Sequence, residues 1–334
     1  MPSGARGLKK SGTDPGGNGM KRLHYYDNLR VILMFLVLFG HFCEISAGST
    51  TYGAFLRFFI YIFHMPLFVF VTGLFHSNDS REKIIHRSIG FLMIYLLMKI
   101  LGLFNSMLMY GRGGLSLVNE GGIPWFMLAL CAWTLMAYVT RSFNTKLLFT
   151  VSILVALAAG YDYSLTTQFS ISRVLVFWPF YLAGMMADRE VILSYMRRRT
   201  VKWAGAATLA ACVGMLWLNY DRLSFIRPLL TGKHAYDSLA EPFVTYGGLV
   251  RLGVYVLAVV LSLMVMAVIP DRELFFTRYG SRTLPIYFFC LPVYQLSNAY
   301  FPSLRIWQYF VLSIVLIPVL GNKWFNKALT SIIR

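Results

Sequence analysis

Two histidines stand inside apolar stretches of this chain, where an ionisable side chain is unexpected. His41 follows the run 31–39, and His64 lies within the run 61–70. Placing an ionisable group at membrane depth costs several kcal/mol, so such a residue is a functional-site hypothesis by default. A neutral imidazole in such a place can accept a proton from a hydroxyl as a general base. The two histidines therefore predict proton chemistry inside the apolar region.

A carboxylate accompanies the first histidine. Glu44 stands three residues beyond His41, so the two share a face if the segment is helical. A carboxylate on one imidazole nitrogen fixes the tautomer and stabilises the imidazolium ion. We therefore predict a catalytic group of His41, Glu44 and His64. Each histidine also has a structural alternative, a hydrogen bond to a backbone carbonyl, and His64 precedes the helix-bending Pro66.

Basic residues near the predicted cytosolic ends of the apolar segments form a second candidate group. Its members are Arg30, Lys83, Arg87, Arg278 and Arg282. Guanidinium and ammonium groups bind phosphates through charge-assisted hydrogen bonds. The group therefore predicts a site where an anionic ligand could enter from the cytosol. In the alternative interpretation, Arg30 is an interfacial anchor or pairs with Asp27, and the other four only set the topology.

The composition indicates a polytopic membrane protein. Of 334 residues, 57% are hydrophobic and 13% are charged, whereas soluble domains carry about 25% charged residues. The formal net charge is +17, but the basic residues are spread over short loops between apolar segments, which argues against nucleic-acid binding. The four cysteines show no metal-ligand spacing, so we expect reduced structural thiols and no metal site. They are Cys43, Cys131, Cys212 and Cys290.

Apolar segments of spanning length set the expected fold. A transmembrane helix needs about 20 mostly apolar residues. Ten candidates follow from this criterion: 29–47, 54–75, 88–109, 123–140, 146–161, 171–187, 201–220, 245–269, 283–301 and 305–322. Lys and Arg concentrate in alternate loops, which places 188–200 in the cytosol and 221–244 outside. The prediction is an all-α membrane protein of about ten transmembrane helices with both termini cytosolic.

The positions of the apolar segments also predict the domain organisation and the depth of the two histidines in the membrane. Residues 1–21 are rich in Gly, Ser and Lys, are not a secretory signal, and are expected to be a disordered cytosolic tail. Residues 22–334 then form one transmembrane domain. At about 1.5 Å per residue, His41 lies roughly 18 Å from Leu29, and His64 roughly 15 Å from Ala54. In a hydrocarbon core of about 30 Å, the histidines reach similar depth.

Six segments along roughly 22–320 carry a family resemblance. They are Asp27-Asn28-Leu29-Arg30 with His41 after ten further residues, Phe63-His64-Met65-Pro66-Leu67-Phe68-Val69-Phe70-Val71-Thr72-Gly73, Arg87, Pro124-Trp125-Phe126-Met127-Leu128-Ala129-Leu130, Phe180-Tyr181-Leu182-Ala183-Gly184, and Tyr279-Gly280-Ser281-Arg282-Thr283-Leu284-Pro285-Ile286-Tyr287. In this order they resemble the acyltransferase-3 family of integral membrane acyltransferases.

The resemblance implies transfer of an acyl group, usually acetyl, from cytosolic acyl-CoA to a hydroxyl of a carbohydrate or lipid-linked glycan. It further implies a multi-pass protein of the bacterial cytoplasmic membrane, with acetyl-CoA as co-substrate. His41 then matches the essential histidine, Arg30 its partner arginine, and His64 a second-span histidine. Arg87 and the other basic residues of the second candidate group would hold the donor, and Trp125 and Tyr287 are candidate substrate-lining residues. Trp125 has an aromatic-belt alternative. Cys290 stands where many members have a histidine.

A second class of function remains open at this stage. In a proton-coupled transporter or flippase of a glycan or lipid, the His–Glu group would relay protons across the membrane. Transporters often contain repeated halves with broken helices, and no such repeat is evident in the sequence. Consumption of a thioester distinguishes the two classes. The sequence does not determine the acceptor, the acyl chain length or the oligomeric state.

Overall fold

The computed structural model describes residues 24–46, 50–165 and 167–333. These residues form a bundle of α-helices, and they contain no β-strand beyond one isolated bridge between Asn119 and Gln168. The all-α prediction is thus confirmed for this part of the chain. The predicted tail 1–21 lies outside the described residues.

Ten helices coincide with the ten predicted apolar segments. They are α1 (His24–Ser46), α2 (Thr51–Leu74), α3 (Arg81–Tyr110), α4 (Trp125–Val139), α5 (Thr145–Ala158), α6 (Ile171–Met186), α8 (Arg199–Leu218), α11 (Gly247–Val268), α12 (Thr283–Tyr300) and α13 (Ile306–Leu320). The shorter helices among the described residues are α7 (Arg189–Met196), α9 (Tyr220–Leu223), α10 (Arg227–Leu230) and α14 (Lys323–Ile333).

The length and apolarity of these helices identify a membrane protein. Within the described residues, five helices are long and apolar enough to cross a bilayer: α1, α2, α3, α8 and α11. The pair α13 and α14 would make a sixth crossing, bent by 68°. Helices α4, α5 and α6 are apolar but shorter. The membrane class therefore stands, whereas ten crossings and two cytosolic termini remain predictions.

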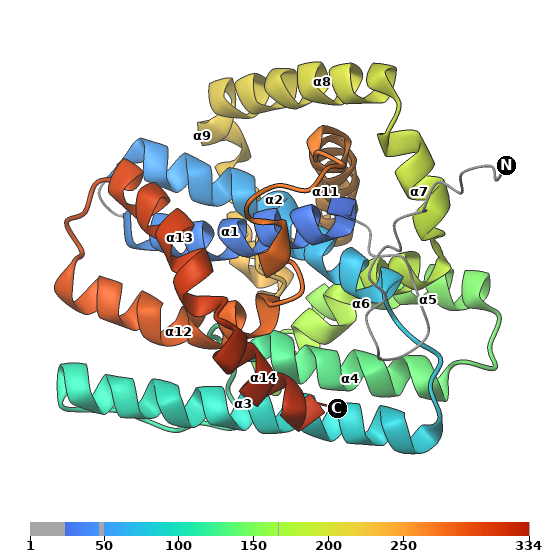
Figure 1. Ribbon diagram of the computed structural model, residues 1–334. Coiled ribbons are helices and arrows are strands. Elements are labelled where there is room, and N and C mark those ends of the chain that lie inside the picture. The colour runs from blue at the N-terminus through green and yellow to red at the C-terminus, as the bar shows by residue number, and fades with distance from the viewer. Residues whose placement is uncertain (1–23, 47–49, 166, 334) are drawn as a thin grey trace, which may run out of the picture.

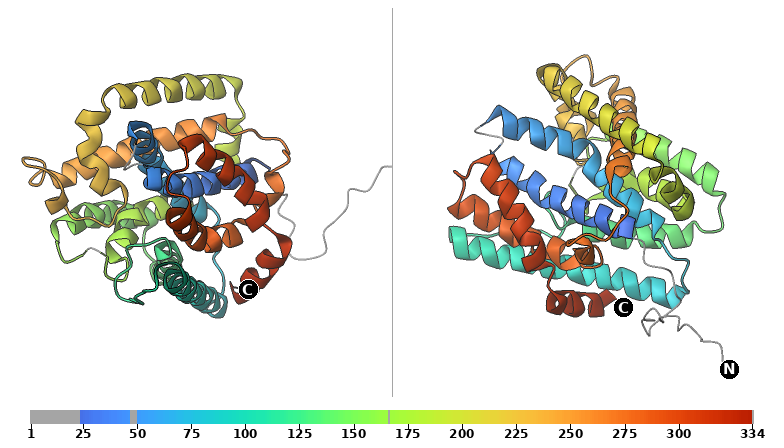
Figure 2. Two further views of the ribbon diagram at one scale, coloured as in Figure 1. Left: turned by 90° about the vertical axis from the view of Figure 1, so that its left-hand side faces the viewer. Right: turned by 45° about the horizontal axis from the view of Figure 1, so that its top comes forward.

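Helices α1 and α2 form the centre of the bundle (Figure 1). Helix α1 packs against α2, α12 and α13, while α2 also packs against α6 and α11. Helix α3 packs against α4 and α12, and α8 lies outside against α11. The two further views show the same arrangement, with α8 on the periphery (Figure 2). Side chains on α1 and α2 can therefore meet groups from several other helices.

Two glycines let α2 and α6 approach closely. A Cβ atom on Gly73 would lie 2.1 Å from the carbonyl oxygen of Tyr181, and one on Gly184 would lie 2.1 Å from that of Phe70. Small residues of this kind allow membrane helices to pack backbone to backbone. The contact fixes the end of α2 against α6, where His76 meets Tyr181.

The polar residues at the start of α1 hold a loop. Asn28 donates hydrogen bonds from Nδ2 to the carbonyls of Pro270 (2.8 Å) and Arg272 (2.9 Å). Its Oδ1 accepts a hydrogen bond from Thr277 at 2.6 Å. Gly280 comes so close that its Cβ would lie 2.5 Å from Cα of Asp27. The run that opens α1 therefore has two roles, because Asn28 anchors the loop before α12 and Arg30 lines a cavity.

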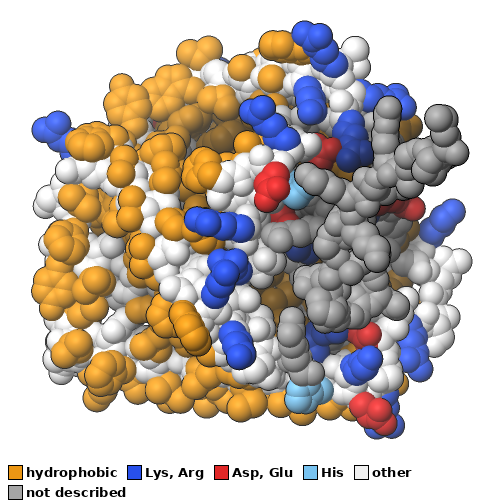
Figure 3. Space-filling model, viewed as in Figure 1, with side chains coloured by type: hydrophobic (Ala, Val, Ile, Leu, Met, Phe, Trp, Pro, Cys, Tyr) orange, Lys and Arg blue, Asp and Glu red, His pale blue; other side chains and the backbone are white. Residues whose placement is uncertain are grey.

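Charged side chains are unevenly distributed over the surface. In the space-filling view, hydrophobic side chains cover most of the left of the molecule, and most Lys and Arg side chains lie toward the right (Figure 3). Helices α1 and α3 begin on this basic side (Figure 1). The pattern agrees with the predicted excess of basic residues in alternate loops.

Candidate active site

Two cavities are lined by successive turns of the same helices. The first, here the arginine cavity, has a volume of about 350 Å³ and includes Arg30, Phe68 and Tyr287. The second, here the histidine cavity, has a volume of about 230 Å³ and includes His41 and His64. Helices α1, α2, α4 and α12 contribute to both. The cavities therefore follow one another along the helix axes.

The spacing on α1 gives the separation of the two cavities. Met34 lines the arginine cavity and His41 the histidine cavity, seven positions or about 10 Å apart at roughly 1.5 Å per residue. Arg30 lies near the N-terminal end of α1. Under the predicted topology, the arginine cavity faces the cytosol and the histidine cavity faces the outer side.

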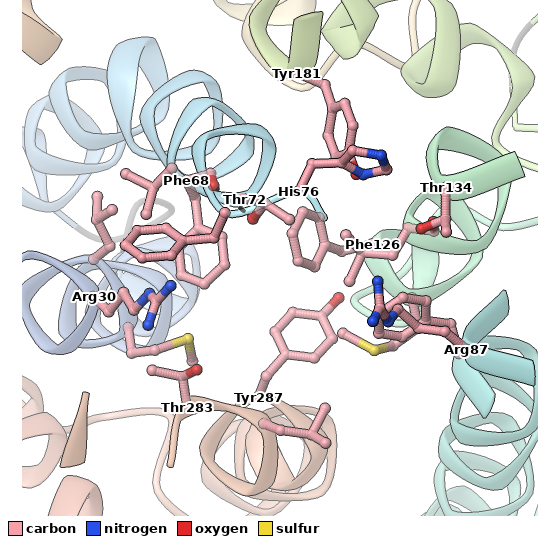
Figure 4. Close-up of a pocket in the computed structure, with 18 of the residues that line it drawn as sticks. Arg30, Phe68, Thr72, His76, Arg87, Phe126, Thr134, Tyr181, Thr283 and Tyr287 are labelled. Atoms are coloured by element: carbon pink, nitrogen blue, oxygen red, sulfur yellow. Dashed lines mark hydrogen bonds between the residues drawn. The ribbon is translucent and has the colours of Figure 1, made fainter. Parts of the chain in front are cut away.

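Arg30 and Arg87 approach the arginine cavity from opposite sides in the close-up, with the phenol of Tyr287 between them (Figure 4). The guanidinium of Arg30 lies 4.0 Å from the ring centroid of Phe75, and its Nη1 is 3.9 Å from Asp27 Oδ1. Two cations so placed can bind a ligand that carries several negative charges.

Arg87 is held in position by the loop that precedes α3. Its Nη2 donates to Asp79 Oδ2 at 2.6 Å, and its Nη1 donates to Ser77 Oγ at 3.0 Å. The hydrogen bond from Ser77 and the contact with Arg87 lower the pKa of Asp79. Arg87 therefore has a fixed orientation and retains further N–H groups for a ligand.

His76 is a lining residue that the sequence did not single out. Its Nδ1 lies 2.9 Å from the hydroxyl of Tyr181. Burial, and next the nearby charge of Arg87, lower the pKa of His76. The imidazole is thus kept neutral and can hydrogen-bond a ligand without adding charge.

Three of the predicted donor residues lie elsewhere in the structure. Lys83 and Arg278 are exposed, and the guanidinium groups of Arg278 and Arg282 lie over the ring of Tyr279, at 5.0 and 5.8 Å from its centroid. None of the three lines the arginine cavity. That these three residues bind the donor remains a prediction, and any such contact would lie outside this cavity.

His41 and Glu44 form the pair that the spacing predicted. Nδ1 of His41 lies 3.6 Å from Glu44 Oε2, and the hydroxyl of Tyr61 is 3.4 Å from each of these atoms. Glu44 also accepts a hydrogen bond from Arg57 Nη2 at 2.9 Å. With its Nδ1 directed to Glu44, His41 has Nε2 available as the basic nitrogen.

His64 lies in the same cavity and is 4% exposed. Its Nδ1 lies 2.8 Å from the carbonyl oxygen of Ile60, one turn earlier on α2. Because a carbonyl can only accept, Nδ1 carries the proton and Nε2 has the lone pair. The predicted structural hydrogen bond to a backbone carbonyl is therefore present at Nδ1 of His64, while Nε2 is still able to accept a proton or a hydrogen bond.

Three basic residues that the sequence analysis did not assign to the site join these histidines. Arg57 on α2, Arg173 on α6 and Lys233 in the loop after α10 all line the histidine cavity. The sequence could have indicated Arg57 and Arg173, because each of them interrupts an apolar segment as His41 does. Lys233 has no such signal, because it lies in a polar loop that only the fold brings to the cavity.

The two predicted substrate-lining residues lie on either side of the wall between the cavities. Tyr287 lines the arginine cavity, and its hydroxyl donates a hydrogen bond to the carbonyl of Ile123, which lines the histidine cavity. Trp125 also lines the histidine cavity, and the guanidinium of Arg173 lies 4.8 Å from its ring centroid. This hydrogen bond thus directly links a residue that lines one cavity to a residue that lines the other.

These features describe a helical membrane protein with two cavities on one path, one lined by Arg30 and Arg87 and the other by His41 and His64. The comparison with protein families agrees with this class. A family model described as an acyltransferase domain matches residues 23–320, so the chain belongs to the acyltransferase-3 family. No curated protein and no solved structure matches the chain. Within the described residues, no group of three or more His, Cys, Asp or Glu side chains is placed to hold a metal ion.

Proposed function

We propose that this membrane acyltransferase is an O-acetyltransferase. It transfers the acetyl group of cytosolic acetyl-CoA to a hydroxyl of a carbohydrate or lipid-linked glycan on the outer side of the bacterial cytoplasmic membrane. The observation that carries this proposal is the pair of cavities on one path, one cationic and one containing two histidines. Neither cavity alone accounts for a donor and an acceptor that arrive from opposite sides.

The arginine cavity suits the donor. The phosphates of CoA would meet Arg30 and Arg87, whose guanidinium groups form charge-assisted hydrogen bonds with phosphate oxygens. The long pantetheine arm would then extend along the apolar residues Leu33, Met34 and Phe68 toward the wall at Tyr287. Movement of this wall would admit the thioester to the histidine cavity.

The histidine cavity suits the acceptor and the chemistry. Nε2 of His41 takes the proton of the acceptor hydroxyl while its oxygen attacks the thioester carbonyl carbon. The carbon–sulfur bond breaks, and the proton passes to the thiolate, so that the products are an acetyl ester and CoA. Glu44 stabilises the imidazolium ion through Nδ1. His64, with its lone pair on Nε2, accepts a hydrogen bond from a neighbouring hydroxyl of the acceptor and thereby orients the sugar.

Substitution of His41 tests the proposal. His41→Asn removes the base, and general-base catalysis contributes roughly 10²–10⁴ in rate. Acetyl-CoA-dependent acetylation should fall by that factor while CoA binding is retained. Glu44→Gln should reduce the rate less, because Glu44 orients the base and stabilises its charge. His86→Asn, at an exposed histidine of α3 outside both cavities, is the matched control.

The same assay separates the enzyme from a transporter. A proton-coupled transporter or flippase would move its substrate without consuming any thioester, in the wild type and in every variant. If the protein releases no CoA from acetyl-CoA when it is mixed with a membrane extract that contains the native acceptor, the transporter is therefore favoured. A folded His41→Asn protein that acetylates at the wild-type rate would refute the assignment of the base.

A further inference from the structure

The histidine cavity contains more positive than negative charge. Its fixed charges are Arg57, Arg173, Lys233 and Glu44, with two histidines beside them. Arg57 and Glu44 form an ion pair at 2.9 Å and largely cancel each other. Arg173 and Lys233 remain, and neither forms a salt bridge with another described residue.

Arg173 is a buried cation with spare hydrogen-bonding capacity. It is 5% exposed and donates from Nη1 and Nη2 to the carbonyls of Gly122 and Gly121, at 3.3 and 3.1 Å. Its Nε is buried without a partner among the described residues. A buried charge that is not paired is costly and is normally compensated by a counter-ion.

Lys233 adds a second cation at the same cavity. It is half-buried and has no hydrogen bond or ion pair with a described residue. Burial, and next the charge of Arg173, lower its pKa. Two cations that repel each other across a small cavity are stabilised by an anion bound between them.

We propose that the acceptor carries its own negative charge, a carboxylate or phosphate on the sugar, which binds between Arg173 and Lys233. This inference rests on the proposed function and specifies its substrate class. The charged group anchors the ring in the histidine cavity, where Trp125 offers an aromatic face and His41 and His64 offer acceptor nitrogens. Anchoring by charge leaves a hydroxyl of the same ring within reach of the base.

The test compares matched acceptors in the full-length protein, purified in lipid nanodiscs. Methyl glucuronide supplies a carboxylate, glucose 1-phosphate a phosphate, and methyl glucoside is the neutral counterpart of the glucuronide. Release of CoA from acetyl-CoA is measured with each acceptor. We expect kcat/KM for at least one anionic acceptor to exceed that for methyl glucoside by about 10-fold or more, equivalent to about 1.4 kcal/mol.

Lys233→Gln is the decisive variant, because Lys233 supports no other described side chain. It should reduce kcat/KM for the preferred anionic acceptor about 10-fold more than kcat/KM for methyl glucoside, since only the anionic acceptor loses a charge interaction. Lys233→Arg should retain the preference, because it keeps the charge. Arg222→Gln, at an exposed residue outside the cavity, removes the same charge and is the control.

Two results would overturn the inference while the acyltransferase function stands. One is equal use of neutral and anionic acceptors by the wild type. The other is an equal loss for all acceptors in Lys233→Gln, which would mean that Lys233 stabilises the reacting carbonyl oxygen. A thermal-shift measurement with the same acceptors, without acetyl-CoA, separates the two proposals. If the anionic acceptors raise the unfolding temperature in a way that depends on Lys233, but the activity assay shows no release of CoA, the anion site is supported and the acetyl transfer is rejected. No stabilisation and no preference rejects the anion site.

Discussion

Removal of Arg87 tests the arginine cavity quantitatively. A guanidinium has five N–H groups, and Arg87 uses one on Nη2 for Asp79 and one on Nη1 for Ser77. Three remain for the phosphates of CoA. A hydrogen bond to a charged group contributes roughly 1.5–3 kcal/mol, so Arg87→Ala should raise the Kd for CoA roughly 10- to 150-fold.

The neighbouring carboxylate moves the expected loss toward the upper end of that range. In Arg87→Ala, Asp79 loses its partner at 2.6 Å and leaves an uncompensated negative charge at the cavity that repels the phosphates. Arg87→Ala combined with Asp79→Ala removes both charges. This double variant should therefore bind CoA more tightly than Arg87→Ala alone, though more weakly than the wild type.

Isothermal titration calorimetry with CoA in nanodiscs measures these affinities. Lys83→Ala is the matched control, because Lys83 is a basic residue one turn earlier on α3 that is exposed and outside the cavity. We expect its Kd to stay close to the wild-type value. If Lys83→Ala and Arg87→Ala weaken CoA equally, general surface charge rather than the arginine cavity binds the donor.

Three further substitutions, the first with a matched control, test the fold and the wall. Gly73→Ala places a Cβ against backbone and should destabilise the protein by about 1–3 kcal/mol in thermal unfolding, whereas Gly214→Ala, with open space around it, should be neutral or stabilising. Asn28→Ala should lower the unfolding temperature, because it removes two hydrogen bonds to part-buried carbonyls and one from the buried Thr277, at about 1–3 kcal/mol in total; an unchanged temperature would contradict its anchoring role. Tyr287→Phe removes the hydrogen bond to Ile123. It should increase CoA release in the absence of acceptor, as the wall opens to water, and an unchanged basal rate would exclude this role.

Helix positions were largely predictable from the sequence. The apolar segment 245–269 became α11 (Gly247–Val268), and 171–187 became α6 (Ile171–Met186), because a segment of that length in lipid must satisfy its own backbone hydrogen bonds. The pairing of His41 with Glu44 was also predictable, since three residues along a helix return to the same face. Such local relations do not depend on the rest of the fold.

The basic donor group shows where this reasoning fails. Arg30, Arg87, Lys83, Arg278 and Arg282 all share the predicted cytosolic side, yet only the first two line the arginine cavity. Charge in a loop sets the side of the membrane but not the direction of the side chain. Arg87 turns inward because Asp79 and Ser77 hold it, and the sequence does not show that contact.

The histidine cavity was decided by tertiary packing. His41, His64, Arg173 and Lys233 come from α1, α2, α6 and a distant loop, and no spacing in the sequence links them. The sequence alone determined that the chain is a helical membrane protein, and it predicted histidines at membrane depth, because burial cost and helix periodicity act locally. Which cations join those histidines depends on close contacts such as Gly73 against Tyr181, and these exist only once the helices have packed.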